Sequence, residues 1–207
     1  SINLERCGVI VGSGIGGMAT LENEHTKLIE RGPGRVSPFL IPMMIPDMPA
    51  GRISMNYGFR GPNYAVVSAC ASAAHSLGDA FMMIKSGLAD VIIAGGTEAV
   101  ITPLAFAGFC SMKAMSTRND NPKKASSPFD LKRDGFIMGE GSGMIILESL
   151  EHAIARKAKI YSEMVGYGTS GDAHHLSAPA PEGAGAQIAI KMALASASLK
   201  PSDIDYI

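Results

Sequence analysis

Cys70 has small neighbours on both sides, because residues 68–72 read SACAS. Residues 63–68 are predicted to form a strand and residues 71–87 a helix, so the thiol falls where the strand passes into the helix. The free N–H groups and positive dipole end of a helix start stabilise a thiolate over a thiol and can hold an oxyanion. The pattern favours a nucleophilic cysteine on a tight turn. The alternative is a buried structural cysteine, since free cysteines are often buried.

The other two cysteines and the one cluster of possible metal ligands are weaker candidates for a functional site. Cys7 opens a predicted strand, and no helix start follows Cys110, so both are interpreted as packing residues. Three cysteines without disulfide-framework or metal-ligand spacing indicate reduced thiols. Asp172 precedes the adjacent pair His174 and His175, but adjacent side chains on a strand point to opposite faces, so we expect no metal site.

The elements that position Cys70 alternate between short apolar runs and helical patterns, which indicates an α/β fold. Strands are predicted at residues 8–11, 63–68, 90–94, 143–147 and 163–167. Helices are predicted at residues 15–30 and 71–87, after residue 147 to about residue 157, and at 183–198. Residues 38–49 contain too many prolines for a regular helix, and residues 116–133 read as a polar loop. The unit 63–95 requires parallel strands with a crossover helix. Residues 203–207 look like the start of another strand.

Composition excludes several classes of protein. The 207 residues carry 18 basic and 19 acidic side chains, a net charge of -1, which argues against a nucleic-acid binder that neutralises phosphates. A hydrophobic content of 46% allows a sizeable core and excludes overall disorder. No apolar run reaches the ~18 residues of a membrane span, and the N-terminus lacks a signal pattern. We therefore expect no membrane partner and a cytoplasmic location, or an organellar one in a eukaryote.

A set of motifs in a fixed order covers nearly the whole chain, from Gly8 to Ile207. They are SACAS at 68–72, ADVIIAGGTE at 89–98, STRND at 116–120, and PFD through RDGF to MGEGSG at 128–143. Together these motifs resemble those of the β-ketoacyl-acyl carrier protein synthases, and within them the bacterial type II elongating enzymes of the synthase II kind. Such a set is more specific than any single motif.

The resemblance implies a thiolase-like layered αβαβα fold, present here in part, and an acyltransferase that needs no cofactor. It makes Cys70 the nucleophile that accepts an acyl chain from a carrier protein. The acyl-enzyme then condenses with the carbanion formed by decarboxylation of malonyl-acyl carrier protein, which gives 3-oxoacyl-acyl carrier protein and elongates a fatty acid. The backbone N–H of Cys70 would be one donor to the tetrahedral oxyanion.

The resemblance also suggests residues around the nucleophile. Ile15 matches an acyl-pocket residue near a dimer interface, where its bulk would limit chain entry; the alternative is that Ile15 only packs the core. Asp172 and His175 match polar residues around the active site, and Ser177 lies near the expected pantetheine channel. Glu140, in a Gly-Glu-Gly turn, is expected to support the backbone.

The implied partners are acyl and malonyl carrier proteins and a second copy of the chain. Carrier proteins of this family are acidic, and Arg35 and Lys113 lie where basic contacts are expected, although lone surface charges are often simply solvated. The homodimer is expected to form through the strand at 63–68.

Some parts of the family pattern are missing from this sequence. In the family, later segments supply two histidines that bind the malonyl thioester, a lysine, and a second glycine-rich loop distinct from residues 12–17. The first quarter of the usual chain precedes Ser1. We therefore expect residues 1–207 to be a partial β-ketoacyl synthase, mostly its N-terminal half with the nucleophile, that alone forms at most the acyl thioester.

Three other functions remain to be weighed. The pattern Gly12-x-Gly14-x-x-Gly17 after an apolar run is formally a dinucleotide fingerprint and would indicate an oxidoreductase, but residues 31–34 stand where an acidic strand end should follow. A catalytically incomplete chain-length partner subunit would typically lack Cys70. A cysteine hydrolase would need a residue to orient its histidine base, and none has a motif here.

Overall fold

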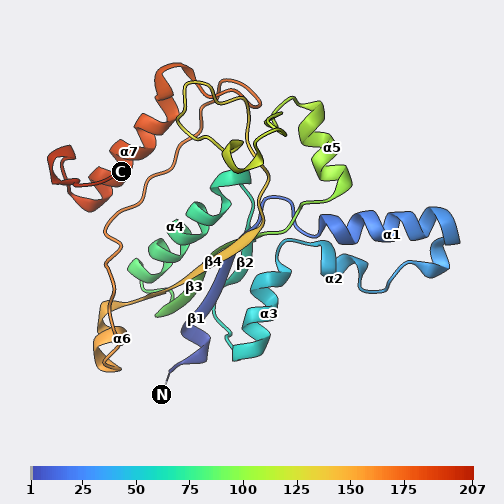
Figure 1. The fold of residues 1–207 in the computed structure, drawn as a ribbon. Helices are drawn as coiled ribbons and strands as arrows, with labels where there is room; N and C mark the ends of the chain where they lie inside the picture. The colour runs from blue at the N-terminus through green and yellow to red at the C-terminus, as the bar shows by residue number, and fades with distance from the viewer. Residues whose placement is uncertain (1) are drawn as a thin grey trace.

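The computed structural model describes residues 2–207, and Figure 1 shows their arrangement. The strands are β1 (Cys7–Gly12), β2 (Asn63–Val66), β3 (Val91–Glu98) and β4 (Gly141–Glu148). The helices are α1 (Met18–Arg31), α2 (Leu40–Met44), α3 (Met48–Tyr57), α4 (Ser72–Lys85), α5 (Pro103–Ser111), α6 (Leu150–Ala155) and α7 (Ala184–Ala197). None of the helices formed by residues 2–207 has both the length and the apolar character needed to cross a bilayer.

The four strands form one mixed sheet in the order β2-β1-β3-β4. β1 pairs in parallel with both β2 and β3, so that Ile10 lies beside Tyr64 on one side and Ala94 on the other. β4 closes the other edge by pairing antiparallel with β3. The predicted parallel β-α-β unit is confirmed in direction, but β1 lies between β2 and β3, so these two strands do not pair directly.

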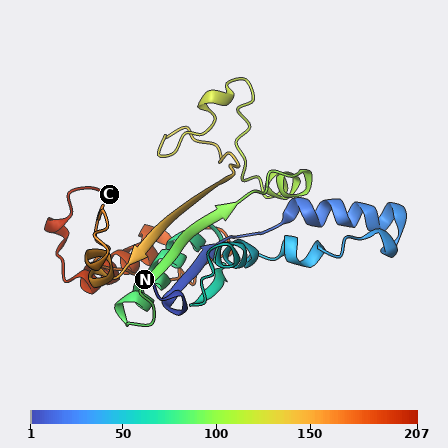
Figure 2. The ribbon, with the colours of Figure 1, turned by 90° about the horizontal axis from the view of Figure 1, so that it is seen from below.

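Helices cover both faces of the sheet, as the two views in Figures 1 and 2 show. Ile10 faces α4 and packs in a cluster with Ala80. Val9 and Val11 face α3 and pack in a second cluster with Ala50. Because successive side chains of a strand point to opposite faces, a central strand covered on both sides must be apolar throughout. This arrangement explains why all of β1 is buried.

Most of the predicted elements are confirmed, with shifted ends. The first helix begins at Met18, three residues after Ile15, because residues 13–17 form a glycine-rich loop. The proline-rich residues 38–49 form the short helix α2 and the first turn of α3. Helix α5 was not predicted from the sequence. Together α1 and α2 project from the sheet as an arm (Figure 2).

The strand predicted at residues 163–167 is wrong, and the structure has no strand at 203–207 either. The first segment is irregular and lies between two helices. A Cβ atom on Gly78 of α4 would meet the Tyr167 ring, and one on Gly166 would meet the backbone of α7 at Ala193. Gly166 and Tyr167 therefore pack on helices, Val165 is 47% exposed, and none of the described strands pairs with this segment.

Candidate functional site

The turn that carries Cys70 joins β2 to α4 by a short 3-10 segment, Ala69–Ala71. Cys70 is exposed and has a free thiol, whereas Cys7 is buried. Burial is the main reason that the pKa of the Cys7 thiol is raised. The turn follows the carboxyl end of β2, which runs parallel to β1 and β3. The predicted position of Cys70 between a strand and a helix is confirmed, and the alternative of a buried cysteine is not.

Hydrogen bonds close this turn on both sides of Cys70. The Ser68 N–H donates to Ser72 Oγ at 2.9 Å, and Ser72 Oγ donates to the Ala69 carbonyl at 2.7 Å. Ser68 Oγ lies 2.6 Å from His75 Nδ1. Ala69 has a φ of 50°, a left-handed conformation that is strained for a residue with a side chain. The bonds made by Ser72 hold that conformation, and Cys70 lies in the 3-10 turn just before α4.

The first turn of α4 packs closely on the ends of two strands. A Cβ atom on Gly12, at the end of β1, would lie 2.3 Å from the carbonyl carbon of Ser72. One on Gly96 of β3 would lie 2.6 Å from Ala73 Cβ. These contacts require glycine at both strand positions, and they bring the helix start next to the glycine-rich loop.

The glycine-rich loop is bound by the side chain of Glu98, which ends β3. Glu98 Oε2 accepts hydrogen bonds from the N–H groups of Gly14 at 2.7 Å and Ile15 at 3.0 Å. Its Oε1 accepts from the N–H of Gly16 and the hydroxyl of Ser13, both at 3.1 Å. A pyrophosphate would need these same N–H groups, but a carboxylate of the protein itself already occupies them. The dinucleotide-binding alternative is therefore not supported.

Ile15 lies in this loop and is 39% exposed, so it is not a core residue of the described structure. The loop runs beside the turn that carries Cys70: a Cβ atom on Gly14 would lie 3.5 Å from Ala69 Cα. The structure thus brings together the neighbourhoods of two residues that the sequence singled out. Sequence reasoning missed Glu98, although an acid at the end of an apolar strand with a glycine-rich loop elsewhere in the chain was a usable signal.

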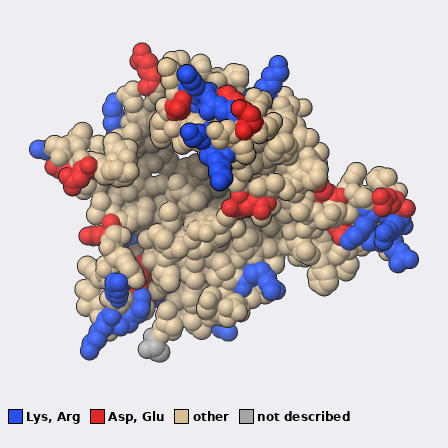
Figure 3. Space-filling view, in the orientation of Figure 1, with Lys and Arg blue, Asp and Glu red and all other residues tan. Residues whose placement is uncertain are grey.

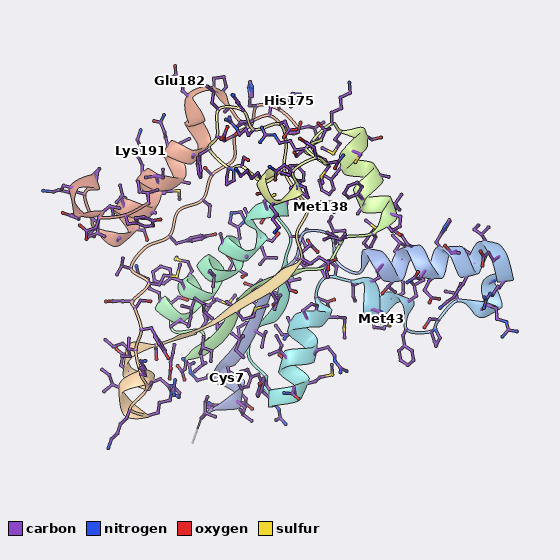
Figure 4. The ribbon with its side chains drawn as sticks, viewed as in Figure 1. Cys7, Met43, Met138, His175, Glu182 and Lys191 are labelled. Atoms are coloured by element: carbon purple, nitrogen blue, oxygen red, sulfur yellow. The ribbon has the colours of Figure 1, made fainter. Side chains whose placement is uncertain are left out.

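Asp172, His175 and Ser177 occupy the irregular segment before α7. His175 Nδ1 accepts hydrogen bonds from the N–H groups of Ser177 and Ala178, both at 3.1 Å. Asp172 Oδ2 accepts from the N–H of Ala180 at 2.8 Å. Figure 4 shows His175 at the end of the molecule opposite Cys7. In the described structure the side chains of Asp172 and His175 hold their own segment together, Ser177 takes part through its backbone N–H, and none of the three bonds to the Cys70 turn.

The two basic residues expected to contact a carrier protein lie apart. Arg35 ends a 3-10 turn that follows α1 at the tip of the arm, and Lys113 follows α5. Figure 3 shows one group of basic side chains at that tip and another over the upper part of the molecule. Both residues are exposed, and they lie on different elements of the fold.

The polar loop after α5 is organised by Asp134. Its carboxylate accepts from Ser116 Oγ at 2.7 Å and from the Thr117 N–H at 3.0 Å. These bonds, with Arg118 nearby, lower the pKa of Asp134. Glu140 accepts from the Ile101 N–H at 2.8 Å, which agrees with its expected backbone-supporting role. The predicted polar loop is confirmed.

A cavity of about 690 Å³ lies between the glycine-rich loop, α2 and α3. Its lining is mainly apolar and includes Phe39, Met43, Ile45 and Met48, with the polar side chains Arg52 and Glu98. Figure 4 shows Met43 at the base of the arm. Within residues 2–207, no group of three or more His, Cys, Asp or Glu side chains is placed to hold a metal ion.

The fold and the thiol define a class: α/β proteins that present a cysteine at the start of a helix, beside the ends of parallel strands. Sequence comparison narrows this class. The family described as "Beta-ketoacyl synthase, N-terminal domain" matches residues 1–153, and "Beta-ketoacyl synthase, C-terminal domain" matches residues 161–207. The chain belongs to the β-ketoacyl synthase family.

Individual relatives agree with this assignment. The 3-oxoacyl-[acyl-carrier-protein] synthase 2 of Synechocystis is 53% identical over 206 residues, which cover 100% of this chain and 50% of that protein. The crystal structure of a β-ketoacyl synthase from Burkholderia phymatum matches with a TM-score of 0.90 and 35% identity, over 100% of this chain and 50% of that one. A type II polyketide ketosynthase, solved with its acyl-carrier protein, matches with a TM-score of 0.90 and 31% identity, over 99% and 52%. The chain thus spans about half the length of the relatives it matches, and it has their thiolase-like fold in part.

Proposed function

We propose that the full-length protein containing this chain elongates fatty acids by condensing an acyl group with malonyl-acyl carrier protein. The observation that carries this proposal is the exposed Cys70 thiol on the turn before α4. Its support is the family membership of the chain and the 53% identity to a 3-oxoacyl-[acyl-carrier-protein] synthase.

The first half of the reaction is assigned to Cys70. Its sulfur attacks the carbonyl carbon of the acyl thioester, a carbon–sulfur bond to Cys70 forms, and the carrier protein leaves as its free thiol. Small neighbours, Ala69 and Ala71, leave room for the thioester. The N–H of Cys70 is the expected donor to the oxyanion formed in this step.

In the second half, malonyl-acyl carrier protein loses carbon dioxide, and the resulting carbanion attacks the carbonyl carbon of the acyl-enzyme. A carbon–carbon bond forms, the bond to the Cys70 sulfur breaks, and 3-oxoacyl-acyl carrier protein is released. The resemblance assigns the histidines of this step to a segment beyond Ile207. Within this chain, Ile15 is proposed to shape the acyl entrance, and Asp172, His175 and Ser177 are proposed to border the pantetheine path.

The acyl-enzyme provides the direct test. We expect mass spectrometry of the full-length protein, incubated with acyl-carrier protein, to find one acyl adduct on Cys70. Cys70→Ala should abolish it, whereas Cys110→Ala, the control at the other exposed thiol, should retain it. An adduct elsewhere, or none, would refute the assignment of Cys70 as the nucleophile.

The carrier protein is proposed as the partner at Arg35 and Lys113, since one structural neighbour is a ketosynthase solved with its acyl-carrier protein. Charge reversal at either residue should raise KM for the carrier substrate more than it lowers kcat, increasingly so at low salt. Equal KM values for the variants and the wild type would remove these two residues from the interface. The proposed substrates of the enzyme are bound to the acyl carrier protein. We therefore propose that the enzyme works where that carrier protein is found, in the cytoplasm or, in a eukaryote, in an organelle.

A homodimer through β2 is also proposed. β2 is an edge strand of the sheet, so one side of its backbone has no neighbouring strand among the described residues. Val67, which follows it, is 59% exposed. Pairing of two such edges across a twofold axis would satisfy these groups. Sedimentation of the full-length protein tests the proposal, and a monomer would contradict it.

A further inference from the structure

Glu98 holds the glycine-rich loop with four hydrogen bonds, and these bonds have no role in the chemistry assigned to Cys70. The donors are the Ser13 hydroxyl and the N–H groups of Gly14, Ile15 and Gly16, at 2.7 to 3.1 Å. Both carboxylate oxygens are used, two donors to each. All four donors are neutral, so the contact is an anion held by three backbone N–H groups and one hydroxyl.

The geometry makes this anchor necessary. Glycines at positions 14, 16 and 17 lower the cost of unfolding the loop, because glycine has many accessible backbone conformations when it is free. Gly16 has a φ of 84°, and the Gly17 N–H donates to the Met44 carbonyl at 2.9 Å. The latter bond ties the far end of the loop to α2. The part around Ile15 has Glu98 as its hydrogen-bonding partner.

The position of Ile15 matters because its loop lies against the turn of the nucleophile. A Cβ atom on Gly14 would be in van der Waals contact, at 3.5 Å, with Cα of Ala69, the residue before Cys70. A displacement of the loop would therefore move the Ile15 side chain relative to the thiol without any change in the turn itself.

From these contacts we propose that Glu98 is a positioning residue that sets acyl-chain selectivity by fixing the loop that carries Ile15 against the turn that carries Cys70. This inference rests on the proposed function, because it assumes that an acyl group is carried on Cys70. It adds a residue that acts through Ile15 and touches neither the thiol nor the acyl chain.

The variants Glu98→Gln and Ile15→Ala separate this role from general stability. In Glu98→Gln an amide NH2 replaces one carboxylate oxygen. Placed at Oε1 it faces the Gly16 N–H, so that hydrogen bond is lost, whereas the Ser13 hydroxyl can turn to accept from the amide; the charge of the anchor is lost as well. The measured quantity is the ratio of kcat/KM for butyryl- and myristoyl-acyl carrier protein in the full-length enzyme. We expect Glu98→Gln to change this ratio about tenfold, in the same direction as Ile15→Ala.

A double-mutant cycle provides the sharper result. If Glu98 acts through Ile15, adding Glu98→Gln to Ile15→Ala should change the ratio by less than about twofold. Changes that multiply independently would overturn the inference, as would an unchanged ratio in Glu98→Gln. Glu24→Gln is the matched control, since buried Glu24 accepts from the Ser37 N–H at 2.7 Å but lies in the arm, and its ratio should equal that of the wild type.

Hydrogen exchange checks the structural step independently of activity. The amides of residues 14–16 should exchange slowly in the wild type and faster in Glu98→Gln, with no change around Ser37. Unchanged exchange would overturn the anchoring role. If Glu98→Gln does not fold, Glu98→Asp, which keeps the charge on a shorter side chain, and Ser13→Ala, which removes one donor, give the same readouts with smaller expected shifts.

The two proposals fail in different ways. Absence of an acyl adduct on wild-type Cys70 would refute the proposed function. A normal adduct in the wild type, with an unchanged chain-length ratio in Glu98→Gln, would refute only the role of Glu98.

Discussion

Ser76 and Gly95 exchange two hydrogen bonds: the Ser76 hydroxyl donates to the Gly95 carbonyl at 2.6 Å and accepts from the Gly95 N–H at 3.1 Å. Ser76 lies in α4 and is fully buried, and Gly95 lies in β3. A side chain of the helix therefore satisfies both backbone groups of one strand residue. The pair joins the helix that begins at the nucleophile turn to the strand that ends at Glu98.

Ser76→Ala should destabilise the protein by about 1–3 kcal/mol, because it leaves a buried N–H and carbonyl without their partner. Urea denaturation of the full-length protein measures this change. Ser86→Ala is the control. The Ser86 hydroxyl donates an exposed hydrogen bond to the Met83 carbonyl, and its loss should cost less than about 0.5 kcal/mol. Equal effects of the two substitutions would show that the pair with Gly95 is not stabilising.

Two helical glycines should respond oppositely to alanine. Gly51→Ala in α3 should stabilise by about 0.5–1 kcal/mol, because the nearest atom to the new Cβ, the Met48 sulfur, is 3.9 Å away. Gly78→Ala in α4 should destabilise by about 1–3 kcal/mol, because its Cβ would lie 1.9 Å from Tyr167 Cζ. Thermal unfolding measures both. A stabilised Gly78→Ala would mean that the segment around Tyr167 does not pack on α4 in solution.

Glu148 should contribute to stability at neutral pH but not in acid. Arg156, bound to Glu148 at 2.7 and 2.6 Å, is the main cause of the lowered pKa of Glu148, and His152 adds to it. The folded state therefore favours the ionised carboxylate. Its contribution is complete above the unfolded pKa of about 4.3 and is lost as pH falls through the lower folded value.

Glu148→Gln should cost about 1 kcal/mol at pH 7, because the Arg156 side chain is half exposed and solvent screens the pair. The difference from wild type should shrink on acidification below about pH 4.3. Urea midpoints measured across this range test the sign. A difference that grows in acid would contradict the lowered pKa.

Ser72→Ala should slow acylation of Cys70 about tenfold, because it removes two hydrogen bonds that hold the left-handed Ala69. The measurement is the rate of adduct formation at saturating acyl-carrier protein, so that kcat rather than KM is tested. Ser72→Thr keeps the hydroxyl and should restore part of the rate. Wild-type rates in Ser72→Ala would show that these bonds do not position the thiol.

Much of the fold was predictable from local pattern. The apolar run at residues 8–11 and the three- and four-residue spacing at 71–87 gave β1 and α4 within a few residues. The strand expected at 163–167 was wrong, because an apolar extended segment can pack on helices as well as in a sheet. Sequence alone also did not indicate that β1 lies between β2 and β3.

The site was also predictable only where it depends on local sequence pattern. The position of Cys70 between β2 and α4 depends on residues next to it in sequence. Glu98 was missed because its hydrogen bonds reach a loop more than eighty residues earlier in the chain. The sequence by itself determined the α/β class, the turn that bears the thiol and the family, since each depends on nearby residues or on an ordered set of motifs. Only the tertiary structure decided strand order, the exposure of Cys70 and the use of the glycine-rich loop by a carboxylate, because these depend on contacts between distant segments.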